Sequence, residues 1–154
     1  MKRFVFAGLF LLAACANAPR NVPKGSEATP KAGWLLRGGA ASCVEQFSEN
    51  TLAKRSWAFD GTIQRVAVPD DPESQAPTDV VFAVNRWYKG GSGSTVTVKT
   101  YSRPGGVDSA GGPDPAIGAR ILASGEDVYL WPCGFSLPYT ADNAALFARV
   151  FGNS

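Results

Sequence analysis

The cysteines and the absence of histidine limit the chemistry open to this sequence of 154 residues. Cys15, Cys43 and Cys133 carry the thiols, and no two of them form a CxxC pair. Histidine is the commonest general base and a frequent metal ligand, so its absence disfavours nucleophilic catalysis and a conventional zinc site. The three thiols are therefore candidates for acylation, for a disulfide or for an isolated reactive group.

The first 14 residues have the composition of an export signal. Two basic residues precede an apolar run over residues 4–12, which is shorter than the roughly 20 residues of a transmembrane helix. The run ends in the sequence LAAC, whose cysteine is Cys15, and this ending resembles the bacterial lipobox. The resemblance implies cleavage before Cys15 and a lipid on its sulfur. An ordinary secretory signal that is cut after Ala18 is the alternative.

Residues 15–33 are expected to be the lipidated cysteine and a flexible tether. The segment has three prolines and few large apolar side chains, so it cannot bury enough surface to offset its ordering entropy. Ala16 stands where an aspartate commonly retains Gram-negative lipoproteins at the inner membrane. The resemblance therefore implies a bacterial cell envelope protein, anchored in the outer membrane and facing the periplasm. In a Gram-positive cell the same anchor implies the cell membrane.

The charge of the folded part argues against nucleic-acid binding. The whole chain has 15 basic and 13 acidic residues. Six basic residues and one acidic residue lie before Gly38, which leaves nine basic against 12 acidic residues, or about −3, for the rest. The basic residues in question are Lys2, Arg3, Arg20, Lys24, Lys31 and Arg37, and the acidic one is Glu27. A nucleic-acid-binding domain would carry a basic patch instead.

Residues 34–154 are predicted to form one mainly β domain. Alternating, β-branched and aromatic residues predict five strands: one over 57–68, two in a hairpin over 79–101, and two more over 119–124 and 127–131. The last two are expected to be joined by Gly125-Glu126. In the first strand, a bulge near Gly61 would keep Val66 and Val68 on the same face as Ile63. Five short strands with many glycines and prolines are typical of a small antiparallel barrel.

Two helices and two irregular segments complete the expected domain. Ser48–Arg55 is predicted as a short helix with an incomplete capping box, because Thr51 is neither Glu nor Gln. A C-terminal helix is predicted over Thr140–Phe151, with Thr140 as N-cap and Gly152 at the C′ position. The segment 34–39 is expected at the edge of the domain, and 102–118 is expected to be a long loop.

Removing Cys15 from the count leaves Cys43 and Cys133 as a possible pair. In an oxidising envelope, two such cysteines are expected to form a disulfide. The closed loop of about 90 residues would stabilise the fold by roughly 4–5 kcal/mol in the chain-entropy model. A redox-active or nucleophilic thiol is the alternative.

Five motifs follow one another along the chain: SCV at 42–44, WAFDGTI at 57–63, VNRWYKG at 84–90, the segment 118–131, and CGFS at 133–136. Their order resembles that of the netrin-like domain of the tissue inhibitors of metalloproteinases and their bacterial relatives. The resemblance covers about residues 41–151. It implies a five-stranded OB-type antiparallel barrel with a short N-terminal helix and a C-terminal helix. It also implies a disulfide between Cys43 and Cys133.

The sequence departs from this family where the inhibitors bind zinc. The inhibitors begin with a cysteine whose free amine chelates the metal, whereas Ala41 occupies that position here and lies inside the chain. The cysteine that would pair with it is also missing from residues 102–118. Inhibition of metalloproteases by this mechanism is therefore not expected.

The function favoured by these features is a lipid-anchored, non-catalytic protein-binding module with an envelope protein as partner. Its candidate contact elements are the turn 92–94, the loop 102–118, and the pair Trp87 and Tyr88. The two rings have the alternative role of completing the core. A glycan or small-ligand site on the barrel face is a second hypothesis, and protease inhibition without amine–zinc chelation is a third.

Catalysis and metal binding are weaker alternatives. The paired acids lie in polar loops, where solvated carboxylates are common, and the loop with Asp108 and Asp114 lacks a recognised calcium-binding spacing. The acids are Asp70, Asp71, Glu73, Asp108, Asp114, Glu126 and Asp127. The sequence therefore predicts neither an enzyme, nor a cofactor, nor a metal site.

Overall fold

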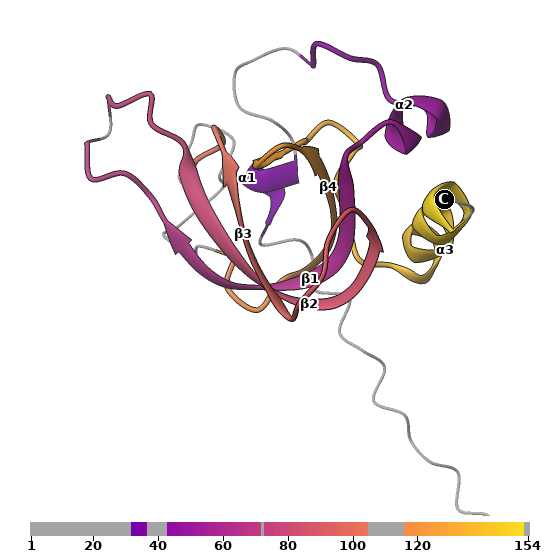
Figure 1. Ribbon diagram of the computed structural model, residues 1–154. Coiled ribbons are helices and arrows are strands. Elements are labelled where there is room, and N and C mark those ends of the chain that lie inside the picture. The colour runs from indigo at the N-terminus through magenta and orange to yellow at the C-terminus, as the bar shows by residue number, and fades with distance from the viewer. Residues whose placement is uncertain (1–31, 37–42, 72, 105–115, 153–154) are drawn as a thin grey trace, which may run out of the picture.

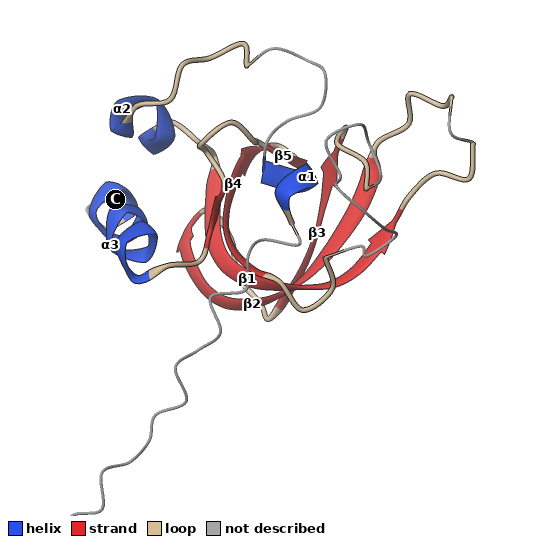
Figure 2. Ribbon diagram, turned by 180° about the vertical axis from the view of Figure 1, so that it is seen from behind, coloured by secondary structure: helices blue, strands red, loops and turns tan. Residues whose placement is uncertain are grey.

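The computed structural model describes residues 32–36, 43–71, 73–104 and 116–152. Its strands close into a five-stranded barrel (Figures 1 and 2). The strands are β1 (Trp57–Ala67), β2 (Thr78–Lys89), β3 (Thr95–Thr100), β4 (Arg120–Glu126) and β5 (Tyr129–Leu130). They follow the order β1-β2-β3-β5-β4, and β4 pairs back with β1. The predicted mainly β barrel of OB type, with a short helix before the strands and a helix at the C-terminal end, is confirmed.

Closure of the barrel depends on a short contact between β3 and β5. These two strands are parallel and pair through Lys99 and Tyr129, whereas the other barrel pairs are antiparallel. The strand β5 is shorter than the predicted 127–131. Gly125 and Glu126 belong to β4, and the turn begins at Asp127, where φ is 50°. A short strand β6 (Leu137–Pro138), absent from the prediction, pairs with β4.

The long strand β1 is distorted as its sequence predicts. Its pairing with β2 shifts register at three places, including Asp60/Gly61 and Ile63/Arg65. A Cβ at Gly61 would lie 2.9 Å from the Phe59 ring, so a larger residue does not fit. After the second of these shifts, Val66 packs against the barrel core, as expected. Val68 lies beyond the strand and is exposed, so the prediction that it continues this face is wrong.

The barrel interior contains a helical turn that the sequence predicts at the edge of the domain. The helix α1 (Gly33–Leu36) lies in the mouth of the barrel, as Figures 1 and 2 both show. Ala32 and Leu35 are buried in the same cluster as Phe59, Phe82 and other inward-facing residues. The edge assignment of 34–39 is therefore wrong for α1. Four residues are too short to show a helical period.

A second apolar layer lies between the barrel and its outer helices. The helices α2 (Glu49–Ala53) and α3 (Ala141–Phe151) lie side by side on one flank of the barrel (Figure 1). Phe147 and Phe151 of α3 pack with Leu52 of α2 and with Leu122 of β4. This layer buries the outward-facing side of part of the sheet.

The helix caps match the predicted N-caps but differ in two details. Ser48 and Thr51 form a complete capping box, because the Thr51 hydroxyl accepts the Ser48 N–H at 2.8 Å. Threonine thus replaces the Glu or Gln that the prediction required. Thr140 caps α3 through the N–H of Asn143 at 3.1 Å. Gly152 is the C-cap with φ −72°, so the left-handed C′ position expected for this glycine is not formed.

Candidate functional site

Trp87 and Tyr88, the aromatic residues predicted to contact a partner, both pack against apolar clusters of the domain. The Trp87 ring packs edge-to-face against Phe59, with 5.1 Å between ring centroids, and its Nε1 donates to the carbonyl oxygen of Gly93. Tyr88 packs edge-to-face against Phe147 of α3. These contacts favour the core role over the role of exposed anchors. The turn 92–94, the other predicted contact element of this hairpin, is exposed.

The predicted acidic pairs are solvent-exposed where the structure describes them. Asp71 accepts a hydrogen bond from the backbone N–H of Glu73 in the loop between β1 and β2. Glu126 and Asp127 are exposed at the end of β4. Asp108, Asp114 and most of the predicted loop 102–118 lie outside the described residues. Within the described ranges, no three His, Cys, Asp or Glu side chains gather as a metal site.

The one acid that is buried among the described residues is Asp60, at 3% exposure. Arg120 binds it through two hydrogen bonds, of 2.9 Å from Nε and 2.6 Å from Nη2, and Asn85 donates a third of 3.2 Å. The hydrogen bonds to Asp60 raise the pKa of Arg120. The Arg120 guanidinium also lies 3.6 Å from the centroid of the Tyr139 ring. A carboxylate so fully paired is not available as a general base.

The segment Cys43–Ser48, which we call the disulfide arm, is a first candidate site. The Cys43–Cys133 disulfide joins it to the segment after β5, with 6.0 Å between the Cα atoms. The predicted disulfide is thus confirmed. Gly134 follows Cys133 and lies against the Phe47 ring. Phe47 packs edge-to-face on Phe135. The arm is therefore fixed to the barrel although it belongs to no helix or strand.

Arg55 provides a second brace for the disulfide arm. Its side chain is 5% exposed, and its Nη2 donates to Glu45 Oε2 at 2.7 Å. Nη1 lies 3.5 Å from Glu126 Oε2. The guanidinium carbon also lies 3.9 Å from the centroid of the Trp131 ring. A desolvated cation over an aromatic ring contributes about 2 kcal/mol, so this brace is substantial.

Between these braces, the arm presents an apolar side chain to solvent. Val44 is 90% exposed, the highest value among the exposed large apolar residues of the described chain. It lies between the disulfide at Cys43 and the ion pair at Glu45. A fixed backbone lowers the entropy lost on binding. The arm therefore presents Val44 to solvent on a backbone that is held at both neighbouring residues.

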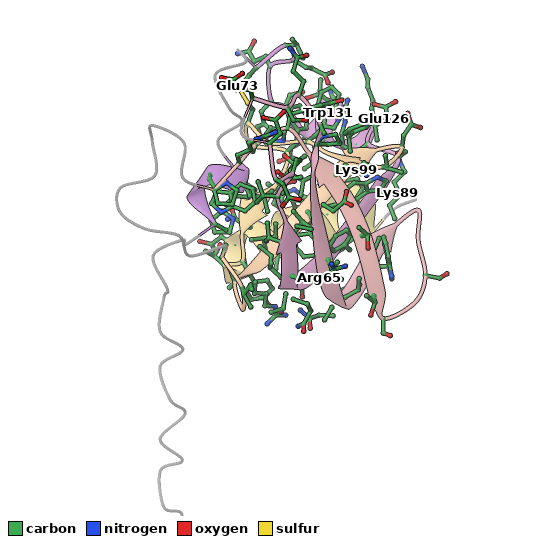
Figure 3. All side chains as sticks on the ribbon, turned by 90° about the vertical axis from the view of Figure 1, so that its left-hand side faces the viewer. Arg65, Glu73, Lys89, Lys99, Glu126 and Trp131 are labelled. Carbon is green, nitrogen blue, oxygen red and sulfur yellow. A yellow bond between two sulfur atoms is a disulfide. The ribbon has the colours of Figure 1, made fainter. Side chains whose placement is uncertain are left out.

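The second candidate site lies on the outer side of β3 and β5 and is called the tyrosine face. It comprises Asp79, Lys99, Tyr101, Val128 and Tyr129. The rings of Tyr101 and Tyr129 are stacked, 5.4 Å between centroids and 8° from parallel, with 3.4 Å between their hydroxyl oxygens. Tyr101 is 67% exposed. Figure 3 shows Lys99 toward the same end of the barrel as Glu126 and Trp131.

Strand alternation explains how the tyrosine face forms. Val98 and Thr100 of β3 are buried, so Lys99 and Tyr101 point outward. Lys99 pairs across β3 and β5 with Tyr129, and its Nζ lies 2.7 Å from Asp79 Oδ1 on β2. This alternation is visible in the sequence, although the two tyrosines were not selected from it. Their stacking was not visible, because it depends on the parallel contact between β3 and β5.

The predicted lipidation site Cys15 and the position of Ala41 lie outside the described residues. No helix within the described ranges is long and apolar enough to cross a membrane. No protein-family model matches the chain, and a search of curated proteins finds no similar sequence.

Proposed function

We propose that the chain is a lipid-anchored, non-catalytic protein of the bacterial cell envelope, and that its netrin-like barrel is a protein-binding module. Its anchor is Cys15, and its location is the outer membrane facing the periplasm. The export signal and the lipobox-like LAAC sequence support the anchor. Several acyl chains on one residue give stable membrane attachment, since each buried CH₂ contributes about 0.8 kcal/mol.

The observation that carries the binding function is the exposure of Val44 on a fixed backbone. An isolated exposed valine is ordinary on a protein surface. Val44 differs because a disulfide and a largely buried arginine hold the residues on either side of it. A partner that covers Val44 buries apolar surface, and little conformational entropy is lost because the arm is already ordered. The proposed partner is an envelope protein with a small apolar pocket.

The proposal of a non-catalytic role is supported by the side chains available for chemistry. The sequence contains no histidine. Asp60 is bound by Arg120 in an ion pair, and Cys43 and Cys133 are joined in the disulfide. The role proposed for the disulfide arm is therefore to present Val44 to a protein partner.

A membrane fractionation test addresses the anchor. The Cys15→Ser variant should lose labelling by a palmitate analogue and should leave the membrane fraction, while the wild-type chain keeps both. A Cys15→Ser chain that still takes up the label and stays on membranes would overturn this part of the proposal.

A photo-cross-linking test addresses the protein partner. A photo-reactive phenylalanine derivative replaces Val44 in the full chain, in the cells that make it, and a matched variant carries the same group at Val68. Val68 is exposed and lies just beyond the C-terminal end of β1, whereas the disulfide arm precedes the N-terminal end of this strand. We expect a discrete protein adduct from position 44 alone. Equal adducts from both positions, or none from position 44, would contradict the proposal.

A further inference from the structure

We propose that the tyrosine face binds an uncharged oligosaccharide, at a site separate from the disulfide arm. The starting observation is the exposed ring of Tyr101. Tyr129 stacks against one face of this ring and fixes its orientation, with 8° between the ring planes. The side chain is nevertheless 67% exposed. An exposed aromatic ring that is already held in place suits the flat, C–H-rich face of a sugar ring.

The polar groups beside the ring fit sugar hydroxyls. Lys99 and Asp79 lie next to the stack on the same outer surface, and each side chain is about two-fifths exposed, at 39% and 41%. The lysine ammonium has three N–H donors and the aspartate has acceptor oxygens. Their 2.7 Å contact uses one donor and one acceptor, which leaves capacity for both kinds of hydrogen bond. The two tyrosine hydroxyls add donors and acceptors at the ring edge.

The charge balance of the face selects an uncharged ligand. Lys99 and Asp79 neutralise each other. The hydrogen bond to Tyr129 raises the pKa of Tyr101 above its ordinary value of about 10, so the Tyr101 ring is uncharged near neutral pH. Because the sequence from Gly38 onward carries about −3, a strongly anionic polysaccharide is disfavoured.

The position of the face in the barrel agrees with this ligand class. OB-type barrels bind oligosaccharides and oligonucleotides on the face of the second and third strands, between the loops that join strands one to two and four to five. The tyrosine face has this position, since it includes Asp79 of β2, Lys99 of β3 and Val128 of the turn between β4 and β5. The net charge of about −3 from Gly38 onward disfavours an oligonucleotide, which leaves the oligosaccharide.

The test is a titration of the full chain, in a detergent without sugar groups, with a β-1,4-linked hexamer of N-acetylglucosamine. Nuclear magnetic resonance should show shifts for the rings of Tyr101 and Tyr129 and for the Lys99 amide. Tyr101→Ala should weaken the affinity at least tenfold. Tyr139→Ala is the matched control, because Tyr139 is also exposed but lies on Arg120, and it should bind as the wild type does.

Three results would overturn the proposal. The first is an absence of shifts at millimolar hexamer. The second is a set of shifts away from the tyrosine face that Tyr101→Ala does not alter. The third is equal or tighter binding of a sulfated hexasaccharide at the same rings. If the first result comes with a lower melting temperature of Tyr101→Ala, the stack serves only to close the barrel.

Discussion

The disulfide arm and the tyrosine face are both exposed, but different forces hold them in place. The arm has no ladder of backbone hydrogen bonds to a strand and depends on the Cys43–Cys133 bond, the Arg55–Glu45 ion pair and the cap at Ser48. The tyrosine face follows from strand alternation and the β3–β5 contact. Removing the disulfide or the Arg55–Glu45 ion pair should therefore make the arm more mobile and leave the structure of the tyrosine face intact.

The largest expected effect comes from removing the disulfide. The double variant Cys43→Ser with Cys133→Ser should lose about 2–5 kcal/mol of unfolding free energy, because the closed loop no longer restricts the unfolded chain. Denaturant unfolding measures this loss. Amide hydrogen exchange should accelerate more over residues 43–47 than at Lys99 and Tyr129. Equal acceleration in both regions would show that the arm and the tyrosine face are one unit.

A smaller effect is expected from the Arg55→Met variant, which keeps a long side chain but loses the charge. The loss should be about 1–3 kcal/mol, because the contact over Trp131 and the bond to Glu45 disappear while Glu45 and Glu126 can be hydrated.

Arg149→Met is the control for this variant, since the Arg149–Glu49 pair is exposed on both sides. Its unfolding free energy should match the wild type within error. A similar loss in both variants would mean that burial of Arg55 adds nothing to the arm.

The smallest effect concerns the pH dependence of the tyrosine face. The hydrogen bond to Tyr129 raises the pKa of Tyr101 above its ordinary value of about 10. A raised pKa stabilises the folded state fully below the ordinary value, and this contribution is lost as the pH rises through the folded pKa. Ring resonances followed by pH titration should show a lower Tyr101 pKa in Tyr129→Phe.

Tyr88 is the internal control for this titration. Its pKa is raised chiefly by burial, so it should be the same in the wild type and in Tyr129→Phe. A Tyr101 pKa that does not respond to Tyr129→Phe would show that the two rings are not coupled in solution.

Local patterns in the sequence were sufficient for most of the fold. Alternation predicted the five strands, N-cap residues predicted the starts of α2 and α3, and the cysteine count, once Cys15 was set aside, led to the Cys43–Cys133 bond. The buried α1 was missed because Leu35 belongs to an apolar segment without a period. Its burial depends on the space that the closed barrel leaves.

The candidate sites were harder to predict because they depend on contacts between distant residues. Tyr101 and Tyr129 are 28 positions apart, and Asp60 and Arg120 are 60 positions apart. Trp87 and Tyr88 were selected as aromatic neighbours in one strand, and each turned out to pack within an apolar cluster. Sequence indicates which residues face outward, whereas barrel closure decides which of them meet.

The position of α1 has a mechanical consequence. Tension applied to the chain through the residues before Ala32 acts first on a buried turn inside the barrel. Leu35 would have to leave the core, and the bond from the Cys133 N–H to the Leu36 carbonyl oxygen, at 3.0 Å, would have to break. The Cys43–Cys133 cross-link comes later in the chain and still ties the disulfide arm to the segment after β5 when α1 has left. Under load, α1 is therefore the element that yields first, and the barrel is the element that holds.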